Sequence, residues 1–208
     1  KVVPERSVQY VEVTPKGRIQ PEIKSYPYLK PGDPVPVRTV HLFDIAATKE
    51  IPVANDLMGN PWRLTKLQWA ADSGRFTLLY NERGHAVMRL LGIDAVSGDV
   101  SALVEERSDT FIDYAYKTYL RFSEADDGFI WMSERDGWNH LYRYGNDGTL
   151  KSRITKGKWM VRSVTHIDEG KRQIWFDAMG VRPGQDPYFI HRCRVNFDGR
   201  GFAVLTEG

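Results

Sequence analysis

Apolar and polar residues alternate along most of the chain in short runs, and glycine or acidic turns separate these runs. Runs of about four to eight residues that are rich in Val, Ile, Thr and aromatic side chains are typical of β-strands. No segment keeps apolar residues at helical spacing over about 11 residues, the shortest window that carries this signal. The best helix candidate, residues 101–107, is too short to form a stable helix by itself. The pattern therefore predicts an all-β fold.

The strands recur in three units that share one order of strands and turns. Each unit begins with a short strand and an acidic-x-Gly turn, and continues as strand, hairpin, strand, glycine turn and strand. In the opening turn, the glycine is expected to take a positive φ and the acidic side chain to bond nearby backbone N–H groups. The acidic residues that begin these turns are Asp72, Asp126 and Asp168. The glycines of the last turn are Gly98, Gly148 and Gly199, which lie 50 and 51 residues apart.

A repeat of about 50 residues with four strands has the spacing of β-propeller blades. We therefore predict that the chain is a single fragment of a propeller, a partial β-propeller with about three complete four-stranded blades and part of a fourth. The predicted blades are residues 62–108, 109–158 and 159–208, and residues 1–61 hold the partial blade and a proline-rich loop.

The first 61 residues are less regular than the rest. Residues 8–14 and 35–44 have strand patterns, and the proline-rich stretch between them is expected to be a loop or an edge because Pro lacks the backbone donor. Residues 35–44 and 49–53 are candidates for the outer strands of the partial blade. Since a propeller closes with at least about four blades, the fragment is expected to stay an open arc or to self-associate through exposed blade edges.

Composition and charge narrow the class of partner. The chain has 208 residues, of which 41% are hydrophobic and 27% charged, so a globular domain is expected. The 29 basic and 27 acidic residues are scattered, which argues against a nucleic-acid or membrane-surface partner. The single cysteine, Cys193, excludes an internal disulfide and is interpreted as a small strand residue. The start, KVVPERS, indicates a chain processed or cut from something larger.

Motifs for catalysis and cofactor binding are missing from the sequence. No G-x-S-x-G nucleophile turn, Walker motif or G-x-G-x-x-G occurs, and the five histidines do not have zinc-ligand spacing. We therefore predict no catalytic residue, no metal and no cofactor in this chain. His140 and His191 fall on predicted strands and are interpreted as structural. Glu105 and Glu106 would point apart on a strand and could share a ligand on a turn, and a solvated loop pair is the simpler interpretation.

The stretch 111–122, FIDYAYKTYLRF, is rich in aromatic and cationic side chains and connects two predicted blades. Such loops line ligand pockets on propeller faces, and packing between neighbouring blades explains the aromatic residues equally well. The candidates for a substrate pocket are Tyr114, Tyr116, Lys117, Tyr119 and Arg121.

The segment 133–144, SERDGWNHLYRY, together with the residues that follow it, resembles the N-terminal propeller of dipeptidyl peptidase IV-type enzymes in the prolyl oligopeptidase group. The family hairpin SE-x-DG-x-x-HLY is matched by Ser133, Glu134, Asp136, Gly137, His140, Leu141 and Tyr142. The family motif LT-x-G-x-W-x-V is matched by Ile154, Thr155, Gly157, Trp159 and Val161, and Trp175-Phe176 follows as the apolar-aromatic pair. Upstream, YPYLKPGDPVP is similar to the family's YPKAG-x-x-NP-x-V stretch, and LLYNERGH to its LNR-x-Q strand.

The resemblance implies a parent enzyme that is larger than this chain. That parent would be an exported exopeptidase that releases dipeptides, often after Pro or Ala, with an eight-bladed propeller over a C-terminal α/β-hydrolase domain. Its Ser-Asp-His triad would lie in the hydrolase domain, and its paired glutamates would lie before Lys1. This chain would then be a non-catalytic portion that gates or shapes access of the peptide substrate. The family's aromatic-Arg pocket loop corresponds here to residues 113–121.

An alternative function is a TolB- or WD40-like propeller that serves as a protein or glycan scaffold. A complete small metalloenzyme is disfavoured by the missing ligand clusters. The sequence downstream of Gly208 in the parent gene separates the first two hypotheses, because a G-x-S-x-G followed by Asp and His supports the peptidase.

Overall fold

The computed structural model describes residues 6–123 and 127–207. These residues form sixteen strands and one short 3-10 helix, η1 (Asp56–Met58), so the predicted all-β class is confirmed. The chain divides into two compact units, Lys1–Thr39 and Val40–Gly208, which are described separately. Among the described residues, no helix is long and apolar enough to span a membrane.

The first unit contains one antiparallel hairpin of two strands, β1 (Arg6–Glu12) and β2 (Glu22–Tyr28). β2 lies in the proline-rich stretch, so this part of the stretch is the edge rather than the loop of the two expected alternatives. Pro27 is tolerated in β2 because each strand of a two-stranded hairpin has one side without a hydrogen-bonded neighbour. Tyr26 packs edge-to-face against two other tyrosines of the hairpin, which adds to the stability of the pair.

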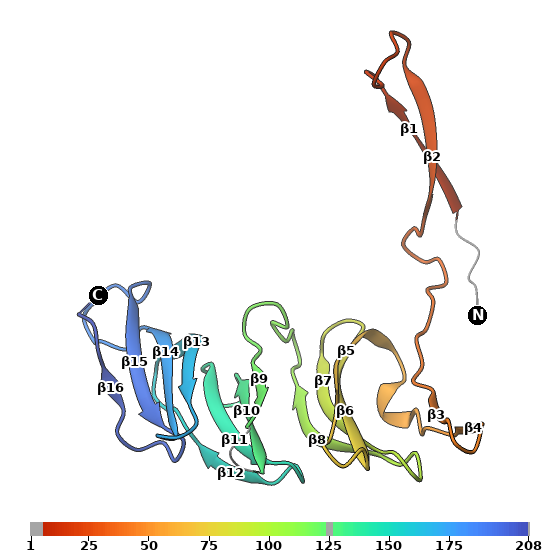
Figure 1. Cartoon of the computed structure of the whole chain (residues 1–208). Coiled ribbons are helices and arrows are strands. Elements are labelled where there is room, and N and C mark those ends of the chain that lie inside the picture. Colours follow the sequence, from red (N-terminus) through yellow and green to blue (C-terminus); the bar gives the residue numbers. More distant parts are fainter. Residues whose placement is uncertain (1–5, 124–126, 208) are drawn as a thin grey trace. The chain divides into compact units, whose positions relative to one another are not determined.

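The second unit contains three four-stranded antiparallel sheets and one two-stranded sheet, shown in Figure 1, which confirms three blades and part of a fourth. The partial blade holds β3 (Leu42–Asp44) and β4 (Lys49–Ile51). The first complete blade holds β5 (Pro61–Trp69), β6 (Arg75–Glu82), β7 (Val87–Asp94) and β8 (Val100–Arg107). The second holds β9 (Leu120–Phe122), β10 (Gly128–Ser133), β11 (His140–Gly145) and β12 (Leu150–Arg153). The third holds β13 (Met160–Asp168), β14 (Gln173–Met179), β15 (Ile190–Asn196) and β16 (Ala203–Val204).

Two expected elements differ from the structure. The helix candidate at 101–107 lies inside β8, because its apolar residues pair with β7 and pack against the next sheet. The expected strand 35–44 is shortened to β3. The predicted blade boundaries at 62–108, 109–158 and 159–208 stay a prediction.

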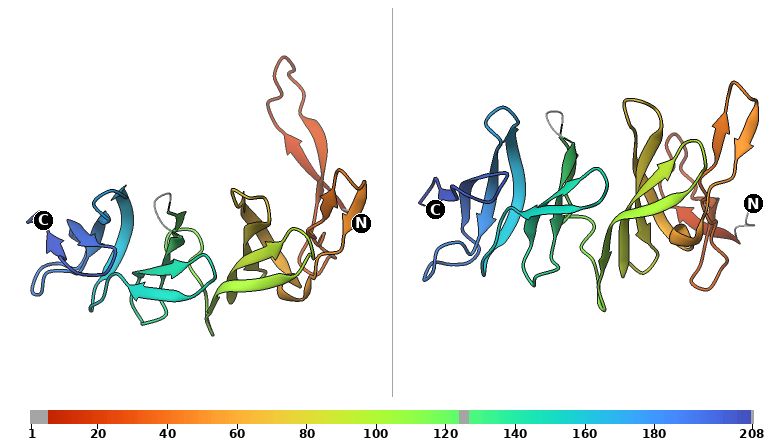
Figure 2. Two further views of the ribbon diagram at one scale, coloured as in Figure 1. Left: turned by 60° about the horizontal axis from the view of Figure 1, so that its bottom comes forward. Right: turned by 90° about the horizontal axis from the view of Figure 1, so that it is seen from below.

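The core lies between neighbouring sheets, which stand side by side in Figure 2. The two middle strands of the second blade, β10 and β11, are buried at almost every position. One cluster joins Leu90 and Val104 of the first blade to Trp131 of the second, and another joins Met132 of the second to Phe176 of the third. Each such apolar side chain stabilises the fold by about 1.5–3 kcal/mol when it is fully buried. The blades therefore stabilise one another.

The backbone conformation of the opening turns differs from the expected one. The acidic side chains act as predicted, since Asp72 Oδ1 accepts the N–H of Gly74 at 2.9 Å and Asp168 Oδ1 accepts that of Lys171 at 2.9 Å. Their glycines do not take a positive φ, so that expectation is wrong. Ser73 adopts φ 57° instead. Asp126 lies outside the described residues.

The last-turn glycines have one conformation in all three blades. Gly98, Gly148 and Gly199 have φ of +79°, +83° and +81°. Each packs against the backbone at the outer edge of the preceding blade, and a Cβ on Gly148 would lie 2.7 Å from the Leu103 carbonyl oxygen. The receiving residues in chain order are Pro52, Leu103, and Arg153 together with Ile154. Glycine is required at these turns for its conformation and for the close approach of two backbones.

Gly148 and Gly137 allow the contact between blades to be tested separately from backbone strain. Both have φ +83°, but a Cβ on Gly137 would meet nothing within 4 Å. Gly137→Ala is expected to destabilise the chain by about 1 kcal/mol through its left-handed backbone. Gly148→Ala is expected to lower the free energy of unfolding by about 2 kcal/mol more than Gly137→Ala does, because the added Cβ forces the blades apart. Urea unfolding of both variants measures the difference, and equal losses would contradict a glycine contact between blades.

Candidate functional site

The predicted hairpin at 133–144 forms the middle of the second blade. β10 and β11 pair in antiparallel register from Gly128↔Gly145 to Ser133↔His140. The tip turns at Gly137, whose N–H donates to the Glu134 carbonyl at 2.8 Å. The Asp-Gly tip and the place in the middle of the sheet agree with the sequence analysis.

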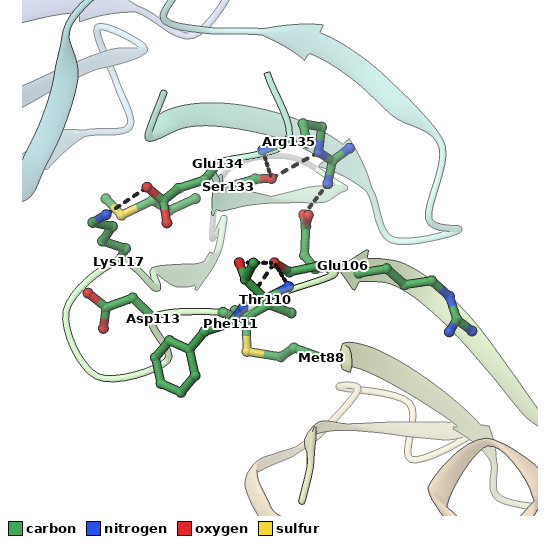
Figure 3. Close-up of a pocket in the computed structure, with 13 residues that line it drawn as sticks. Met88, Glu106, Thr110, Phe111, Asp113, Lys117, Ser133, Glu134 and Arg135 are labelled. Atoms are coloured by element: carbon green, nitrogen blue, oxygen red, sulfur yellow. Dashed lines mark hydrogen bonds and ion pairs between the residues drawn. The ribbon is translucent and has the colours of Figure 1, made fainter. Parts of the chain in front are cut away.

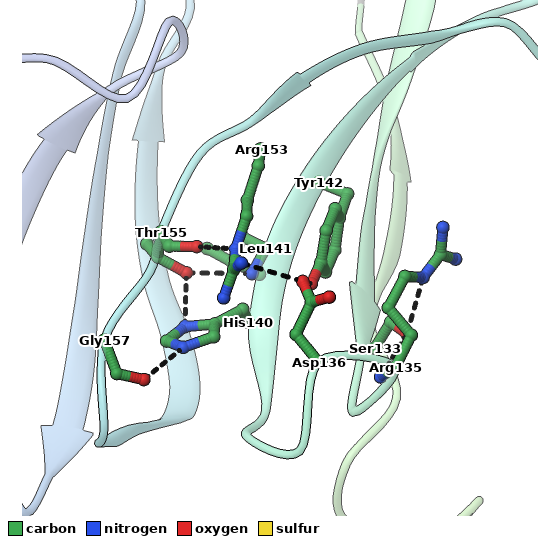
Figure 4. Close-up of polar contacts among 9 residues, drawn as sticks. All are labelled: Ser133, Arg135, Asp136, His140, Leu141, Tyr142, Arg153, Thr155 and Gly157. Atoms are coloured by element: carbon green, nitrogen blue, oxygen red, sulfur yellow. Dashed lines mark hydrogen bonds and ion pairs between the residues drawn. The ribbon is translucent and has the colours of Figure 1, made fainter.

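His140 is fully buried, and its ring is held by two polar contacts, shown in Figure 4. Nε2 lies 3.1 Å from the Gly157 carbonyl oxygen, so this nitrogen carries the proton and donates. Nδ1 then accepts from the Thr155 hydroxyl at 3.0 Å, and the same hydroxyl oxygen accepts the Leu141 N–H at 2.9 Å. The ring packs edge-on against Trp159 with centroids 5.0 Å apart. Burial lowers the pKa of His140, which makes it a neutral structural residue.

The third blade repeats part of this arrangement. His191 Nδ1 lies 3.3 Å from the Thr206 carbonyl oxygen, and the Arg192 N–H donates to the Thr206 hydroxyl at 3.0 Å. His191 and Thr206 each lie 51 residues after their counterparts. The interpretation of both histidines as structural is therefore supported by burial and by their partners.

Arg135 joins the tip of the hairpin to the preceding blade. Its Nε donates to Ser133 Oγ at 3.0 Å, and its guanidinium lies 4.8 Å and 5.7 Å from the ring centres of Tyr142 and Tyr144. It also donates to the Tyr144 hydroxyl and pairs with Glu106 of β8. The side chain of Glu106 is 11% exposed and also accepts the Trp131 Nε1–H at 2.8 Å. Two blades therefore meet at a largely buried ion pair whose two side chains both have further hydrogen bonds.

Glu105 and Glu106 lie on β8 and point to different partners. Glu105 accepts hydrogen bonds from Arg89 and Arg107 at 2.5 Å each, and the bond from Arg107 is the main cause that lowers its pKa. Glu106 faces Arg135. The two carboxylates do not form a joint ligand site, as expected for neighbours on a strand, and they are not a solvated loop pair.

A pocket of about 320 Å³ lies beside the Glu106–Arg135 pair, between the first two blades. Figure 3 shows the pocket and the residues that line it. The end of β8, the loop 108–119 and the hairpin tip form its walls. Lys117 Nζ lies 2.7 Å from Glu134 Oε1 across the pocket. The charged lining residues balance, with three acidic and three basic side chains: Glu106, Asp113, Glu134, Arg107, Lys117 and Arg135.

All five predicted pocket residues lie in the described ranges, but the structure does not bring them together. Lys117 lines the pocket, and Tyr116 is 71% exposed beside it. Tyr114 and Tyr119 pack against the apolar core, so packing between blades explains these two. Arg121 lies on β9 in a separate groove and approaches Glu169, with Nε 3.8 Å from Oε1.

The sequence analysis did not assign Glu106 and Arg135 to the pocket. A signal existed in the S-E-R-D-G tip, since a charged hairpin tip next to the end of a neighbouring outer strand brings polar groups together. The pairing of that tip with β8 is non-local and cannot be derived from spacing. In the described ranges 6–123 and 127–207, no three His, Cys, Asp or Glu residues could together hold a metal ion.

Comparison with known proteins identifies the family. The family model described as the dipeptidyl peptidase IV (DPP IV) N-terminal region matches residues 3–205. The chain belongs to this family. The predicted resemblance is thereby confirmed. The match covers the three blades and the partial blade, and it includes the hairpin and His140 motifs on which the resemblance was based.

Relatives of this DPP IV N-terminal region are larger proteins. Probable dipeptidyl-aminopeptidase B of Aspergillus oryzae is 27% identical over 226 residues, which cover 99% of this chain and 24% of that protein. Its counterpart in Phaeosphaeria nodorum is 24% identical over 195 residues, covering 84% and 21%. The crystal structure of Porphyromonas gingivalis dipeptidyl peptidase 4 superposes with a TM-score of 0.70 at 18% identity, covering 98% of this chain and 28% of that one. The chain therefore spans about a quarter of the length of these relatives, and the structural match shows the fold.

The Glu106–Arg135 pair of this DPP IV N-terminal region is expected to stabilise the fold more than the pair across the pocket. Glu106→Gln leaves Arg135 largely buried without its counter-ion and is expected to cost about 2 kcal/mol. Glu134→Gln is the matched control, because the side chains of Glu134 and Lys117 are 40% and 32% exposed, and its expected loss is under about 1 kcal/mol. Chemical denaturation of both variants measures this, and a larger loss in Glu134→Gln would contradict the assignment.

Stability is also expected to depend on pH through His140. The buried neutral ring has a pKa below the ordinary value near 6.5, so the unfolded chain binds the proton first. The contribution of the neutral His140 to the free energy of unfolding is then at its full value above about pH 7. It falls as the pH drops below about 6.5. Urea unfolding at pH 7.5 and pH 5.5 measures the change. His140→Asn should be less stable at both pH values with a smaller difference between them, and an unchanged difference would overturn the assignment.

Proposed function

We propose that this chain is the non-catalytic propeller portion of a DPP IV-like serine peptidase, and that it shapes the access of peptides to a catalytic centre elsewhere in the parent protein. The observation that carries this proposal is the family match over residues 3–205. The relatives named dipeptidyl-aminopeptidase B, of which this chain spans about a quarter, support a parent with further domains. Under this proposal, the chemistry is carried out by a C-terminal α/β-hydrolase domain of the parent with a Ser-Asp-His triad.

The pocket between the first two blades is the proposed contact with the peptide. Its lining combines both charge signs with the exposed ring of Phe111, and a peptide terminus carries a charge beside apolar side chains. The loop 108–119 forms one wall, and it includes the stretch that corresponds to the family's pocket loop. Lys117 reaches across the pocket to Glu134, so both are placed to contact a bound peptide.

The chemistry of the buried histidines supports a non-catalytic role. A general base needs a lone pair that can reach a substrate proton. His140 uses both ring nitrogens in bonds to Thr155 and Gly157, and it is fully buried. His191 is buried in the same way, with Nδ1 next to the Thr206 carbonyl oxygen. These two side chains therefore serve the fold of their blades.

The proposal predicts that Lys117→Ala in the parent enzyme weakens peptide binding more than turnover. Loss of one charged contact in a solvated pocket is expected to raise KM about three- to tenfold with little change in kcat, because Lys117 does not touch the reacting bond. Steady-state kinetics with a Gly-Pro or Ala-Pro peptide substrate measures both constants. Lys171→Ala is the control, since Lys171 is another surface lysine paired with an acidic residue, outside the pocket.

The isolated chain is expected to show no cleavage of the same substrates. Turnover that copurifies with the chain after removal of host peptidases would contradict a non-catalytic role. An unchanged KM in Lys117→Ala would contradict the assignment of the pocket but not the family.

A further inference from the structure

The loop 108–119 lines the pocket and needs an attachment to keep its shape. Its own polar bonds are local: Ser108 Oγ accepts the N–H groups of Thr110 and Phe111 at 3.2 Å, and Asp113 Oδ1 accepts that of Tyr116 at 3.0 Å. Such bonds fold the middle of the loop, while backbone bonds fix its two ends: the Ser108 N–H donates to the Ala86 carbonyl at 2.9 Å, and the Tyr119 carbonyl accepts the Met132 N–H at 3.1 Å. Between these ends, the side-chain ion pair of Lys117 with Glu134 joins the loop to the second blade, and an exposed pair contributes little in water.

His85 attaches the same loop to the first blade. It lies in the turn between β6 and β7, and its carbonyl oxygen accepts the Ile112 N–H at 2.8 Å. Its imidazole stacks on the ring of Tyr114 with centroids 4.2 Å apart and planes 22° apart. It also packs edge-on against Phe111 at 5.5 Å and against Trp62 of β5 at 5.4 Å. One side chain therefore contacts two aromatic residues of the loop and one of the blade.

The backbone and the other face of His85 hold the ring in place. His85 has φ 59° and follows Gly84 at φ 99°, a left-handed conformation that costs a non-glycine residue about 1 kcal/mol. Nδ1 lies 3.1 Å from Oδ1 of Asn81, which is 7% exposed. A histidine in a conformation suited to glycine is a strained residue whose contacts offset the strain. The contacts that offset it are those with the pocket loop together with those with Asn81 and Trp62 of the first blade.

We infer that His85 is a positioning residue that fixes the pocket-lining loop to the first blade. It acts through Tyr114 and the Ile112 amide, and it does not line the pocket itself. With the loop fixed, Phe111 and Lys117 are ordered before a ligand arrives, so binding does not have to pay their ordering entropy. The effect on peptide binding rests on the proposed function, whereas the attachment of the loop does not.

The test removes the ring and keeps the backbone. In His85→Gly the residue keeps a left-handed φ without penalty and its carbonyl can still bond Ile112. Hydrogen exchange of the amides at 112–116 is expected to accelerate about three- to tenfold, because the loss of a stacked aromatic pair makes local opening of the loop easier. Global unfolding is expected to stay cooperative. His85→Tyr restores a ring and is expected to restore much of the protection. His166→Ala is the matched control, since His166 packs on Trp175 at 5.2 Å away from the loop.

A reciprocal variant keeps the test decisive if His85→Gly does not fold. Tyr114→Leu removes the other ring of the stack and is expected to give the same local acceleration, and the double variant is expected to be no faster than the faster single one. Unchanged loop exchange in folded single variants, a multiplied effect in the double variant, or an equal change in His166→Ala would each overturn the inference.

Kinetics of the parent enzyme separate this inference from the proposed function. His85→Gly is expected to raise KM for a peptide substrate about threefold with kcat unchanged, because the ring acts on binding through the loop. If loop exchange accelerates and KM does not change, the attachment stands and the pocket is not the peptide site.

Discussion

The contact between each last-turn glycine and the outer edge of the preceding blade is the constraint on which the rest of the structure depends. It brings two backbones together without an intervening side chain, so it sets the distance between blades. The receiving residues Pro52, Leu103 and Ile154 recur every 51 residues, and the latter two are 6% and 2% exposed. Leu205 holds the same place in the third blade and is 47% exposed. Leu103 and Ile154 are buried in this contact, whereas Pro52, which also receives a turn, is exposed.

The candidate site depends on the same interface. β8 receives the Gly148 turn at Leu103, and three residues further on it presents Glu106 to Arg135. A backbone contact that fixes the separation of two blades allows a short, largely buried ion pair to form between them, because such a pair offsets its desolvation only with good geometry. The stacking of Arg135 on Tyr142 and the bonds of His140 make the hairpin tip rigid. The pocket is thus a consequence of blade packing.

Repeats and turn chemistry predicted the fold better than the site. Glycine spacing and alternating runs were enough for three blades, because strand order within a blade is local. An error occurred where a local pattern was ambiguous, because residues 101–107 are a short apolar run that fits the spacing of a helix as well as that of a strand. Of the pocket, Lys117 was predicted from a local aromatic-cationic pattern. Its partner Glu134, like Glu106, depends on pairing across blades, which spacing along the chain does not encode.

The two charge pairs at the pocket differ in what a ligand can do with them. The side chains of the Glu106–Arg135 pair are 11% and 29% exposed and have further bonds, so separating them would leave a charge with little water around it. The Lys117–Glu134 pair is more exposed and is worth at most about 1 kcal/mol. A charged peptide terminus can replace one partner of the Lys117–Glu134 pair at little cost in free energy, whereas the Glu106–Arg135 pair keeps its geometry. Under the proposed function, blade packing fixes one wall of the pocket. The loop that His85 holds carries Lys117, the charged side chain that can change its partner when a peptide binds.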